Sequence, residues 1–322
     1  MASPLNSPGA SAPTLLGVGH VALDLIFAVD SLALLPVKHR ARSHVQVVGG
    51  MTASACTAAA RLGAVVRFAS PVGDDDAAEA FQRHFRREGV DASWLRRVAG
   101  ATSTVSAILV DPKGERAIVS RLGSALADPP PFDLDSIEGC DLLLADPRCP
   151  AWAEAAMRAM RDAGRPSVFD GDTAPRADLH RLAGLARWAV FSSQGLRAWL
   201  GVPADDALTE DWVSRGLAEL LEAGAEVAVV TQGEQGLHWL RRGASIQAMP
   251  AFRVGSVIDT LGAGDVFHGA LGVALARGDE DEAALRFASV AAALKCTGAG
   301  GIAAAPRAAD VAAALRASAG TV

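Results

Sequence analysis

Short apolar runs that alternate with amphipathic segments constrain the fold of this chain more than any other feature. Four runs follow one another in the middle of the sequence, CDLLLAD, PSVFDGD, RWAVFSS and EVAVVTQG, and segments with helical periodicity such as AWAEAAMRAMRDAG and DWVSRGLAELLEAG separate them. Short, continuously apolar strands are typical of a parallel sheet that helices cover on both faces. The sequence therefore predicts a three-layer α/β/α fold with a mostly parallel central sheet.

Two segments depart from this rhythm. Residues 105–120 contain two strand-like runs joined by Asp-Pro-Lys-Gly, which indicates a hairpin, and residues 31–48 have an extended character and end in VQVVGG. We expect a small β-sheet lid that projects from the body and is built discontinuously from about residues 31–48 and 99–121. The run TLLGVGHVALDLIF, residues 14–27, is interpreted as one buried strand that leads into a polar turn.

Composition and charge exclude several classes of function. The 322 residues carry a net charge of −6 and offer no basic stripe that could neutralise the phosphates of a nucleic acid. No apolar stretch approaches the roughly 18 residues that a membrane span needs. The first 13 residues are rich in Ala, Ser and Pro and are expected to form a disordered tail. The cysteines lack the spacing of a zinc site, so we expect a reduced, cytoplasmic protein; they are Cys56, Cys140, Cys149 and Cys296.

The stretch DTLGAGDVFHGA suggests a reaction centre. Gly262, Ala263 and Gly264 directly precede the carboxylate of Asp265, and a helix is expected from about residue 263 to residue 276. Backbone N–H groups of such a turn, together with the positive end of the helix, can bind an anion. An acid is useful there if it takes a proton from an attacking hydroxyl while the N–H groups stabilise a transferring phosphoryl group. The alternative is that Asp265 only caps the helix, and this motif alone leaves the two interpretations nearly even.

The rest of the chain carries a family resemblance. DTLGAGDVFHGAL, GVGHVALDLIF and VVGGMTASACTAAARLGAVVRFASPVGDDD occur in the order found in ribokinase-like (PfkB) carbohydrate kinases, and the similarity covers roughly residues 14–316. The resemblance implies one kinase domain over residues 14–322 and an activity that transfers the γ-phosphoryl group of ATP, with Mg²⁺, to a primary hydroxyl of a ketose-type sugar. It also implies a homodimer that forms through the lid.

The resemblance assigns roles to individual positions. Asp265 would be the catalytic base, and the backbone amides of Gly262, Ala263 and Gly264 would form the anion hole. The residues that would contact sugar hydroxyls are Asp24, Gly49 and Gly50, although Asp24 could equally form a turn. The residues that would lie beside ATP are Thr231, Gly233, Gly236, Lys295 and Gly298.

Some positions depart from the family pattern. Where most members carry Asn-x-x-Glu, a motif associated with magnesium and phosphate, this chain has Ser192 and Gly195. Ser54 replaces an Asn that usually follows the Gly-Gly pair. Asp259 is a candidate for holding a monovalent cation such as K⁺, and dependence on such an ion stays open.

Within the family, the motifs VDPKGERAI, LLLADPR, VFDGD and RFASVAAALKCT are similar to those of bacterial kinases of 6-deoxy-6-sulfofructose. This similarity implies that Lys38, Arg148 and Ser120 bind an anionic end of the sugar, since a sulfonate suits one point charge and one planar donor. The alternatives are a solvated Lys38 and an Arg148 that pairs with Asp146 or a helix end. Other substrates stay open, namely ribose, fructose, a sugar phosphate, a sugar acid or a nucleoside, and so does a catalytically silent binding protein of this fold.

Overall fold

The computed structural model describes residues 11–33, 37–112, 114–124, 126, 137–203 and 208–319. Within these ranges nine strands form the larger sheet, in the order β13–β12–β11–β10–β9–β8–β1–β4–β5. All neighbouring strands from β11 through β10, β9, β8, β1 and β4 to β5 pair in parallel. Strand β12 is antiparallel to β11, and β13 is antiparallel to β12. The bounds are β1 Thr14–Val18, β4 Val65–Gly73, β5 Val90–Val98, β8 Leu142–Ala145, β9 Ser167–Gly171, β10 Trp188–Ser192, β11 Val227–Thr231, β12 Leu237–Arg241 and β13 Gln247–Met249.

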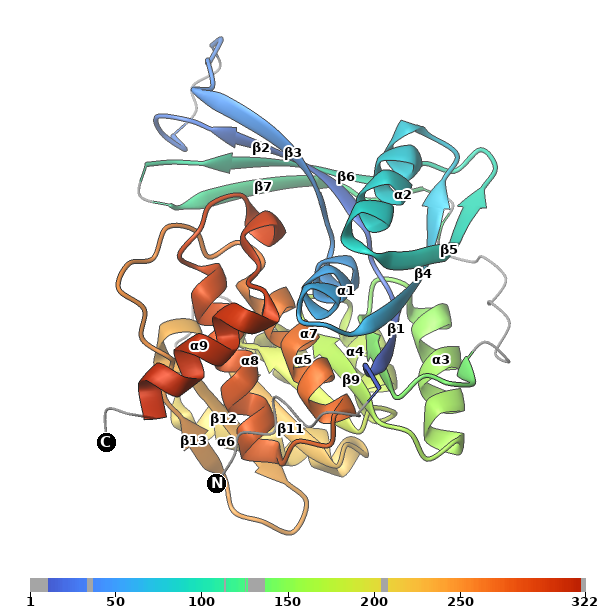
Figure 1. Ribbon diagram of the computed structural model, residues 1–322, viewed down its shortest axis with the longest axis vertical. Helices are drawn as coiled ribbons and strands as arrows, with labels where there is room; N and C mark the ends of the chain where they lie inside the picture. Colours follow the sequence, from blue (N-terminus) through green and yellow to red (C-terminus); the bar gives the residue numbers. More distant parts are fainter. Residues whose placement is uncertain are drawn as a thin grey trace.

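Helices cover both faces of this sheet (Figure 1). The first layer comprises α1 Met51–Arg61, α2 Asp76–Glu88, α7 Ala263–Ala276, α8 Asp281–Lys295 and α9 Ala308–Ala319. The second comprises α3 Pro150–Asp162, α4 Arg176–Ala183, α5 Ser193–Leu200 and α6 Glu210–Ala223. Two short 3₁₀ turns, η3 Gly233–Gln235 and η4 Gly301–Ala304, complete the described helical elements.

The apolar runs bury both of their faces, as the sequence predicts. In β8, Leu142 and Leu144 join the core under the first helical layer, while Leu143 and Ala145 join the core under the second. Successive side chains of a strand point to opposite faces, so a strand between two helical layers must be apolar at every position. The expected α/β/α fold is confirmed.

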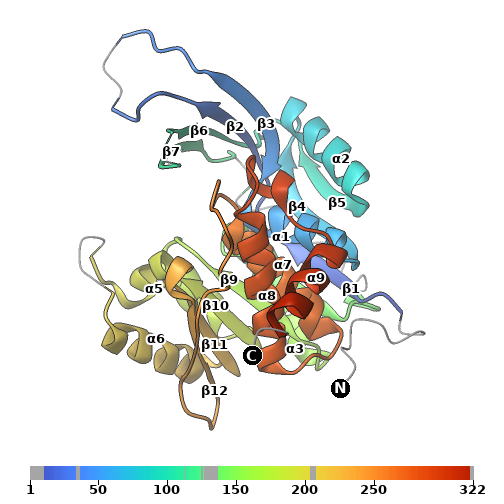
Figure 2. The same cartoon turned by 60° about the vertical axis from the view of Figure 1, so that its left-hand side comes forward.

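A smaller sheet forms the lid, which projects from one end of the body (Figure 2). Its order is β3–β2–β6–β7, with β2 antiparallel to β3 but parallel to β6. The bounds are β2 Ala22–Ala28, β3 Ser43–Gly49, β6 Thr104–Val110 and β7 Arg116–Arg121. The hairpin over residues 105–120 is therefore present as β6 and β7.

The interpretation of residues 14–27 as one strand is wrong. The chain leaves the larger sheet after β1 and enters the lid as β2, so the two halves of this apolar run belong to different sheets. An apolar pattern alone does not show where a strand changes sheet, because both halves of the run are apolar in sequence.

Two further expectations concern the ends of the chain and membranes. Residues 1–10 of the expected tail lie outside the described residues. Among the residues that the structure describes, no helix has both the length and the apolar character needed to cross a bilayer.

Candidate active site

Carboxylates gather where the central parallel strands end. Asp146 follows β8, Asp170 lies near the end of β9, Asp172 follows β9, and α7 brings Asp265 to the same edge. In open α/β sheets this edge is where ligands bind. The negative charges of Asp170 and Asp172 both act on the Asp265 carboxyl, and that of Asp146 acts on Asp170.

Asp265 stands in the first turn of α7 without capping the helix. The N-cap position is Gly262, at φ 79°, and no side chain makes a cap hydrogen bond there. Burial, as the largest cause, and next the neighbouring Asp170 raise the pKa of Asp265 well above its usual value, while His268 acts in the opposite direction. A carboxyl with a raised pKa binds a proton more readily, which suits a general base.

The turn before α7 has fewer free backbone amides for an anion than the sequence predicts. The N–H group of Ala263 donates to the carbonyl oxygen of Thr260 at 3.2 Å, so this amide is used inside the turn. Of the three residues expected to form the anion hole, Gly262 and Gly264 are those whose amides the turn leaves available. Gly262 needs its left-handed φ, and Gly264 is exposed with open space around its Cα.

Asp24 of the lid faces this centre. Its negative charge contributes to the raised pKa of Asp265, and burial raises its own pKa to about 6 against the hydrogen bond from Ser106 that lowers it. Ser106 Oγ lies 3.0 Å from Ser120 Oγ, which places both hydroxyls on the Asp24 face of the lid. A Cβ on Gly49 would lie 2.0 Å from Asp24 Oδ2, so the neighbouring strand must carry glycine there.

Gly50 has a separate reason to be glycine. Its φ is +97°, and a Cβ would lie 2.6 Å from the carbonyl oxygen of His20. The structure therefore brings Asp24, Gly49 and Gly50 to one place at the base of the lid, and Gly50 is the N-cap of α1. Their contact with sugar hydroxyls stays a prediction.

The expected nucleotide-side residues come from two places. Thr231 ends β11, and Gly233 and Gly236 bracket η3, both with positive φ. A Cβ on Gly236 would lie 2.1 Å from the carbonyl oxygen of Met249, whereas Gly233 has open space. Gly298 lies beyond α8, where a Cβ would approach Ala304 Cβ to 2.8 Å.

Lys295 does not face a nucleotide-sized opening. Its side chain is 0 % exposed, and Nζ donates to the carbonyl oxygen of Asp259 at 2.6 Å. The expected direct contact with ATP is therefore replaced by a contact with the chain itself. Burial lowers the pKa of the Lys295 ammonium, and the Asp259 carboxylate opposes this shift.

Two functional candidates, Asp170 and Asp172, were missed in the sequence, and His268 packs beside the first of them. Burial and neighbouring carboxylates raise the pKa of Asp170, while burial lowers the pKa of His268, whose Nε2 lies 3.5 Å from Asp170 Oδ1. His268 Nδ1 lies 2.8 Å from the carbonyl oxygen of Gly264 and so donates to it. Asp172 Oδ1 accepts a hydrogen bond from Ser192 Oγ at 2.9 Å. The signal was the run VFDGD, whose two acids end a buried strand.

The comparisons with known proteins decide the family. The profile of the pfkB family of carbohydrate kinases matches residues 13–308. The chain belongs to the pfkB family of carbohydrate kinases. It is 28% identical over 259 residues to the deoxyribokinase of Salmonella typhi, covering 78% of this chain and 82% of that protein.

Solved structures agree with this assignment. A protein of Agrobacterium tumefaciens provisionally named a ribokinase has a TM-score of 0.90 at 31% identity, covering 97% of this chain and 100% of that one. Arabidopsis thaliana ribokinase, solved in complex with ribose and ATP, shares the fold with a TM-score of 0.83 at 22% identity, covering 95% and 99% of the two chains. This pfkB protein is thus a carbohydrate kinase by family and by fold.

The positions that correspond to Asn-x-x-Glu have a distinct local structure in this pfkB kinase. A Cβ on Gly195 would lie 1.7 Å from the carbonyl oxygen of Gly171, so no side chain fits at that position without backbone movement. Ser192 is instead the N-cap of α5, where its Oγ accepts a hydrogen bond from the Gly195 N–H group at 3.0 Å.

The two cations expected at an anionic sugar end are not brought together. Arg148 is exposed next to the carboxylates, and its backbone N–H group, not its guanidinium, donates to Asp146 Oδ1 at 2.8 Å. Lys38 is exposed in the connection between β2 and β3. That connection leaves the sheet after Ala28, roughly 13 Å along the strand from Asp24. Figure 2 shows it projecting from the body.

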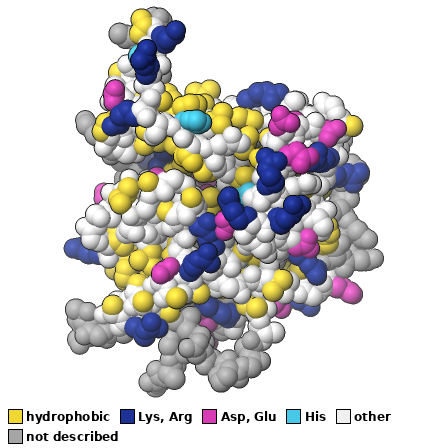
Figure 3. Space-filling model, turned by 45° about the horizontal axis from the view of Figure 1, so that its top comes forward, with side chains coloured by type: hydrophobic (Ala, Val, Ile, Leu, Met, Phe, Trp, Pro, Cys, Tyr) yellow, Lys and Arg dark blue, Asp and Glu magenta, His cyan; other side chains and the backbone are white. Residues whose placement is uncertain are grey.

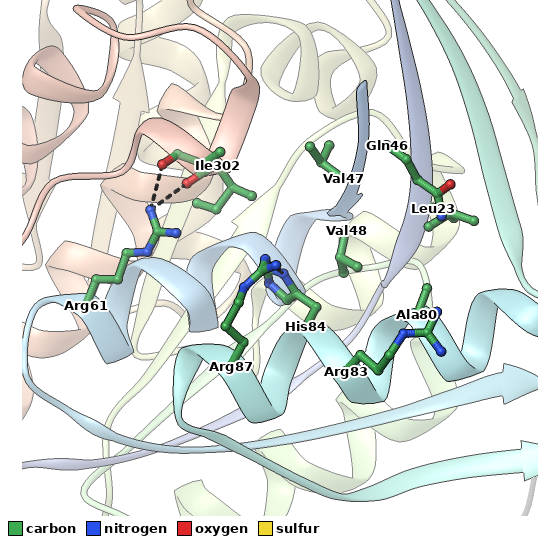
Figure 4. A pocket seen from close by; sticks show the side chains of 11 residues that line it. Leu23, Gln46, Val47, Val48, Arg61, Ala80, Arg83, His84, Arg87 and Ile302 are labelled. Carbon is green, nitrogen blue, oxygen red and sulfur yellow. Dashed lines mark hydrogen bonds between the residues drawn. The ribbon is translucent and has the colours of Figure 1, made fainter. Parts of the chain in front are cut away.

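A cavity of about 300 Å³ lies apart from this centre, between β3, α1, α2 and η4 (Figure 4). Arg61, Arg83, His84 and Arg87 line it, and Arg61 donates hydrogen bonds to the carbonyl oxygens at its η4 side. Leu23, on the opposite face of β2 from Asp24, also lines it. The cavity therefore lies behind the lid strands, and the reacting residues do not line it.

Proposed function

We propose that this protein transfers the γ-phosphoryl group of ATP to a primary hydroxyl of a ketose-type sugar, with Asp265 as the catalytic base. The observation that carries the proposal is the position of Asp265. Its carboxyl group lies at the N-terminus of α7, free of any capping contact, with a raised pKa and with Asp24 facing it from the lid.

The sugar is held between the lid and the body. Asp24 accepts hydrogen bonds from two sugar hydroxyls, Gly49 leaves room for the Asp24 carboxylate, and Gly50 allows the tight turn that carries the chain past the sugar site into α1. Asp265 takes the proton of the attacking hydroxyl as the new O–P bond forms and the bond to ADP breaks. A positioned base of this kind contributes about 10²–10⁴ in rate.

The turn at Gly262 and Gly264 supports the transferring group. The free amides and the positive end of α7 stabilise the negative charge of the phosphoryl oxygens. ATP lies along Thr231, Gly233, Gly236 and the chain beyond α8. Arabidopsis ribokinase, which shares the fold, was solved with ATP, and this supports ATP as the phosphoryl donor.

The residues present fit a Mg²⁺ ion that is held by few protein side chains and mainly by waters and substrate phosphates. Among the described residues, no group of three or more His, Cys, Asp or Glu side chains could hold a metal. Mg²⁺ is commonly held by one or two carboxylates, waters and substrate phosphates, and Asp172 with the adjacent Ser192 offers one such carboxylate. When bound, the ion would neutralise charge on the ATP phosphates.

The distal end of the sugar decides between substrates. Arg148 and Ser120 lie beside the same centre, which favours a sugar with an anionic end such as 6-deoxy-6-sulfofructose. Lys38 joins them only if its loop bends back or if a partner's lid supplies it. Deoxyribose and ribose, in the names of the relatives, are the competing neutral substrates.

An ADP-release assay over a panel of sugars tests the proposal. The panel contains ribose, 2-deoxyribose, fructose, fructose 6-phosphate, a nucleoside and 6-deoxy-6-sulfofructose. We expect turnover with the ketoses and the highest kcat/KM with 6-deoxy-6-sulfofructose. Arg148→Ala should then reduce kcat/KM for the anionic sugar alone. Equal losses for charged and neutral sugars would reject the anionic end, and no ADP release with any sugar would reject the kinase activity.

We also propose that two lids pair in a homodimer. Several large apolar side chains of the lid region are exposed, and Figure 3 shows hydrophobic side chains over the projecting end of the molecule. These residues are Val37, Val45, Ile118, Val119 and Leu122. By strand alternation Val45 and Ile118 lie on the Asp24 face of the lid sheet and Val119 on the opposite face, so both faces expose apolar side chains. Exposed apolar surface of this kind favours an interface.

A further inference from the structure

A buried ammonium group lies beside the turn that leads to Asp265. Lys295 is the last residue of α8, and its side chain is completely buried. Its Nζ donates to the carbonyl oxygen of Asp259 at 2.6 Å and lies 3.4 Å from Asp259 Oδ2. A buried charge is costly unless it is paired, and here the carbonyl and carboxylate oxygens of Asp259 pair the ammonium group.

The Asp259 carboxylate ties two backbone segments together. Its Oδ1 accepts a hydrogen bond from the N–H group of Leu261 at 2.8 Å, and its Oδ2 accepts from Gly300 at 3.0 Å and Gly301 at 2.9 Å. Leu261 directly precedes Gly262, the N-cap of α7. The carboxylate therefore fixes both the entry to the anion-binding turn and the segment that follows α8.

The residues here do not fit a free cation in addition to the lysine. One carbonyl oxygen and one carboxylate oxygen form a ligand set suited to a hard cation such as K⁺. The ammonium group of Lys295 already contacts both oxygens, and a second positive charge beside it would be repelled. A monovalent cation held by Asp259 is thus in conflict with this arrangement.

We propose that Lys295 is a built-in substitute for a monovalent cation, which holds the Asp259 segment and the anion-binding turn in place without K⁺. The proposal rests on the kinase activity proposed above. A tethered ammonium is present at its site at all times, whereas a dissolved ion must bind from solution. Lys295 is a positioning residue, because it acts on the turn through Asp259 and touches neither sugar nor ATP.

The wild-type protein provides the first test. Turnover and Tm are measured at constant ionic strength in choline chloride, NaCl, KCl and NH₄Cl. We expect kcat, KM for ATP and Tm to be the same in all four salts. Saturable activation by K⁺, or a Tm that rises with K⁺ but not with choline, would overturn the proposal.

Two variants of the lysine provide the second test. Lys295→Ala leaves a space beside the two oxygens, whereas Lys295→Met fills most of that space without charge. In choline chloride we expect both to lose about tenfold or more in kcat/KM for ATP. KCl or NH₄Cl should restore most of the activity of Lys295→Ala and raise its Tm by several degrees, with little effect on Lys295→Met.

The outcomes separate the cation role from simple structural support. Folding of Lys295→Ala only in KCl or NH₄Cl would support the proposal. A folded Lys295→Ala that K⁺ does not rescue, or equal rescue of both variants, would contradict it. Arg286→Met is the matched control, because it removes an exposed positive charge from the same helix, where Arg286 pairs with Glu282, and it should show no cation dependence. The Tm measurements need no turnover, so they stand even if the proposed kinase activity fails.

Discussion

At the scale of single residues, burial and like charge set the chemistry of the centre. Asp265, Asp170 and Asp24 all have raised pKa values, and burial is the largest cause in each case. His268 is buried with a lowered pKa, so it is expected to be neutral and to donate from Nδ1 to the backbone. These effects move the pKa of Asp265 toward the working pH, where a general base can both accept and release a proton.

Removing the charge of Asp170 tests this arrangement. In Asp170→Asn, the ionised form of Asp265 loses its strongest repelling neighbour, so the pKa of Asp265 should fall. The rising limb of kcat/KM for the sugar, which follows deprotonation of the base, should move to lower pH by roughly one unit. The measurement is the pH profile of both proteins between about pH 5 and 9.

The same change affects stability in a defined direction. A carboxyl whose pKa is raised in the folded protein favours folding at low pH, and this contribution is lost as pH rises through the folded pKa. The Asn variant lacks that loss, so its Tm should fall less than that of the wild type on the alkaline side. An unmoved pH profile would show that Asp170 does not act on Asp265.

At the scale of elements, strands and helices were easier to predict than the contacts between them. The runs around β8 to β11 and the helix from residue 263 to 276 were predicted from periodicity and glycine turns, and the structure has them. The motifs also pointed to Asp24 and Asp265, whose roles stay predictions. The switch of the chain from β1 to the lid was not, because it depends on which sheet each strand joins.

The missed contacts depend on geometry between distant segments. Lys295 matched a motif beside the nucleotide, but only the packing of α8 against the turn at Asp259 shows where its ammonium group goes. In the sequence, Asp170 is only an acid within an apolar strand. Its effect on the pKa of Asp265 follows from the packing of α7 against β9. Gly195 marked a departure in the sequence, but the close approach of the Gly171 carbonyl oxygen to it is visible only in the fold.

The pairing of β2 with β3 gives a prediction at this scale. In Gly49→Ala, the new Cβ would collide with Asp24 Oδ2 and displace this carboxylate from the sugar site. KM for the sugar should rise by about tenfold or more while KM for ATP changes little. Steady-state kinetics with each substrate varied in turn measure this. Ser43→Ala, at the exposed far end of β3, is the matched control. Equal increases in both KM values would contradict the assignment of Asp24 to the sugar.

At the scale of the whole molecule, the lid is both a cover and an exposed surface. Arg116 of β7 donates a hydrogen bond to Thr260 Oγ1 at 2.7 Å, so the lid touches the turn before α7. Ser120 and Val119 are successive residues of β7 and point to opposite faces, the first toward Asp24 and the second away. The face that carries Val119, 70% exposed, is available to a second lid.

A charge on that face should separate the proposed dimer. We expect light scattering to give a mass about twice the chain mass of 33.0 kDa for the wild type and the single-chain mass for Val119→Lys. A buried, unpaired ammonium at the interface would disfavour pairing. Val65→Lys, at an exposed apolar position of β4 in the body, is the control that should stay dimeric. A wild-type protein of single-chain mass at micromolar concentration would contradict the dimer.

The most direct measurement for the whole account compares ADP release by the wild type and by Asp265→Asn, with saturating ATP and the best sugar of the panel. Asn has nearly the same shape but cannot take a proton, so we expect turnover to fall by about 10²–10⁴. Circular dichroism, Tm and ATP affinity should stay close to those of the wild type. A folded Asp265→Asn protein that keeps turnover within about threefold of the wild type would contradict the role of Asp265 as the base.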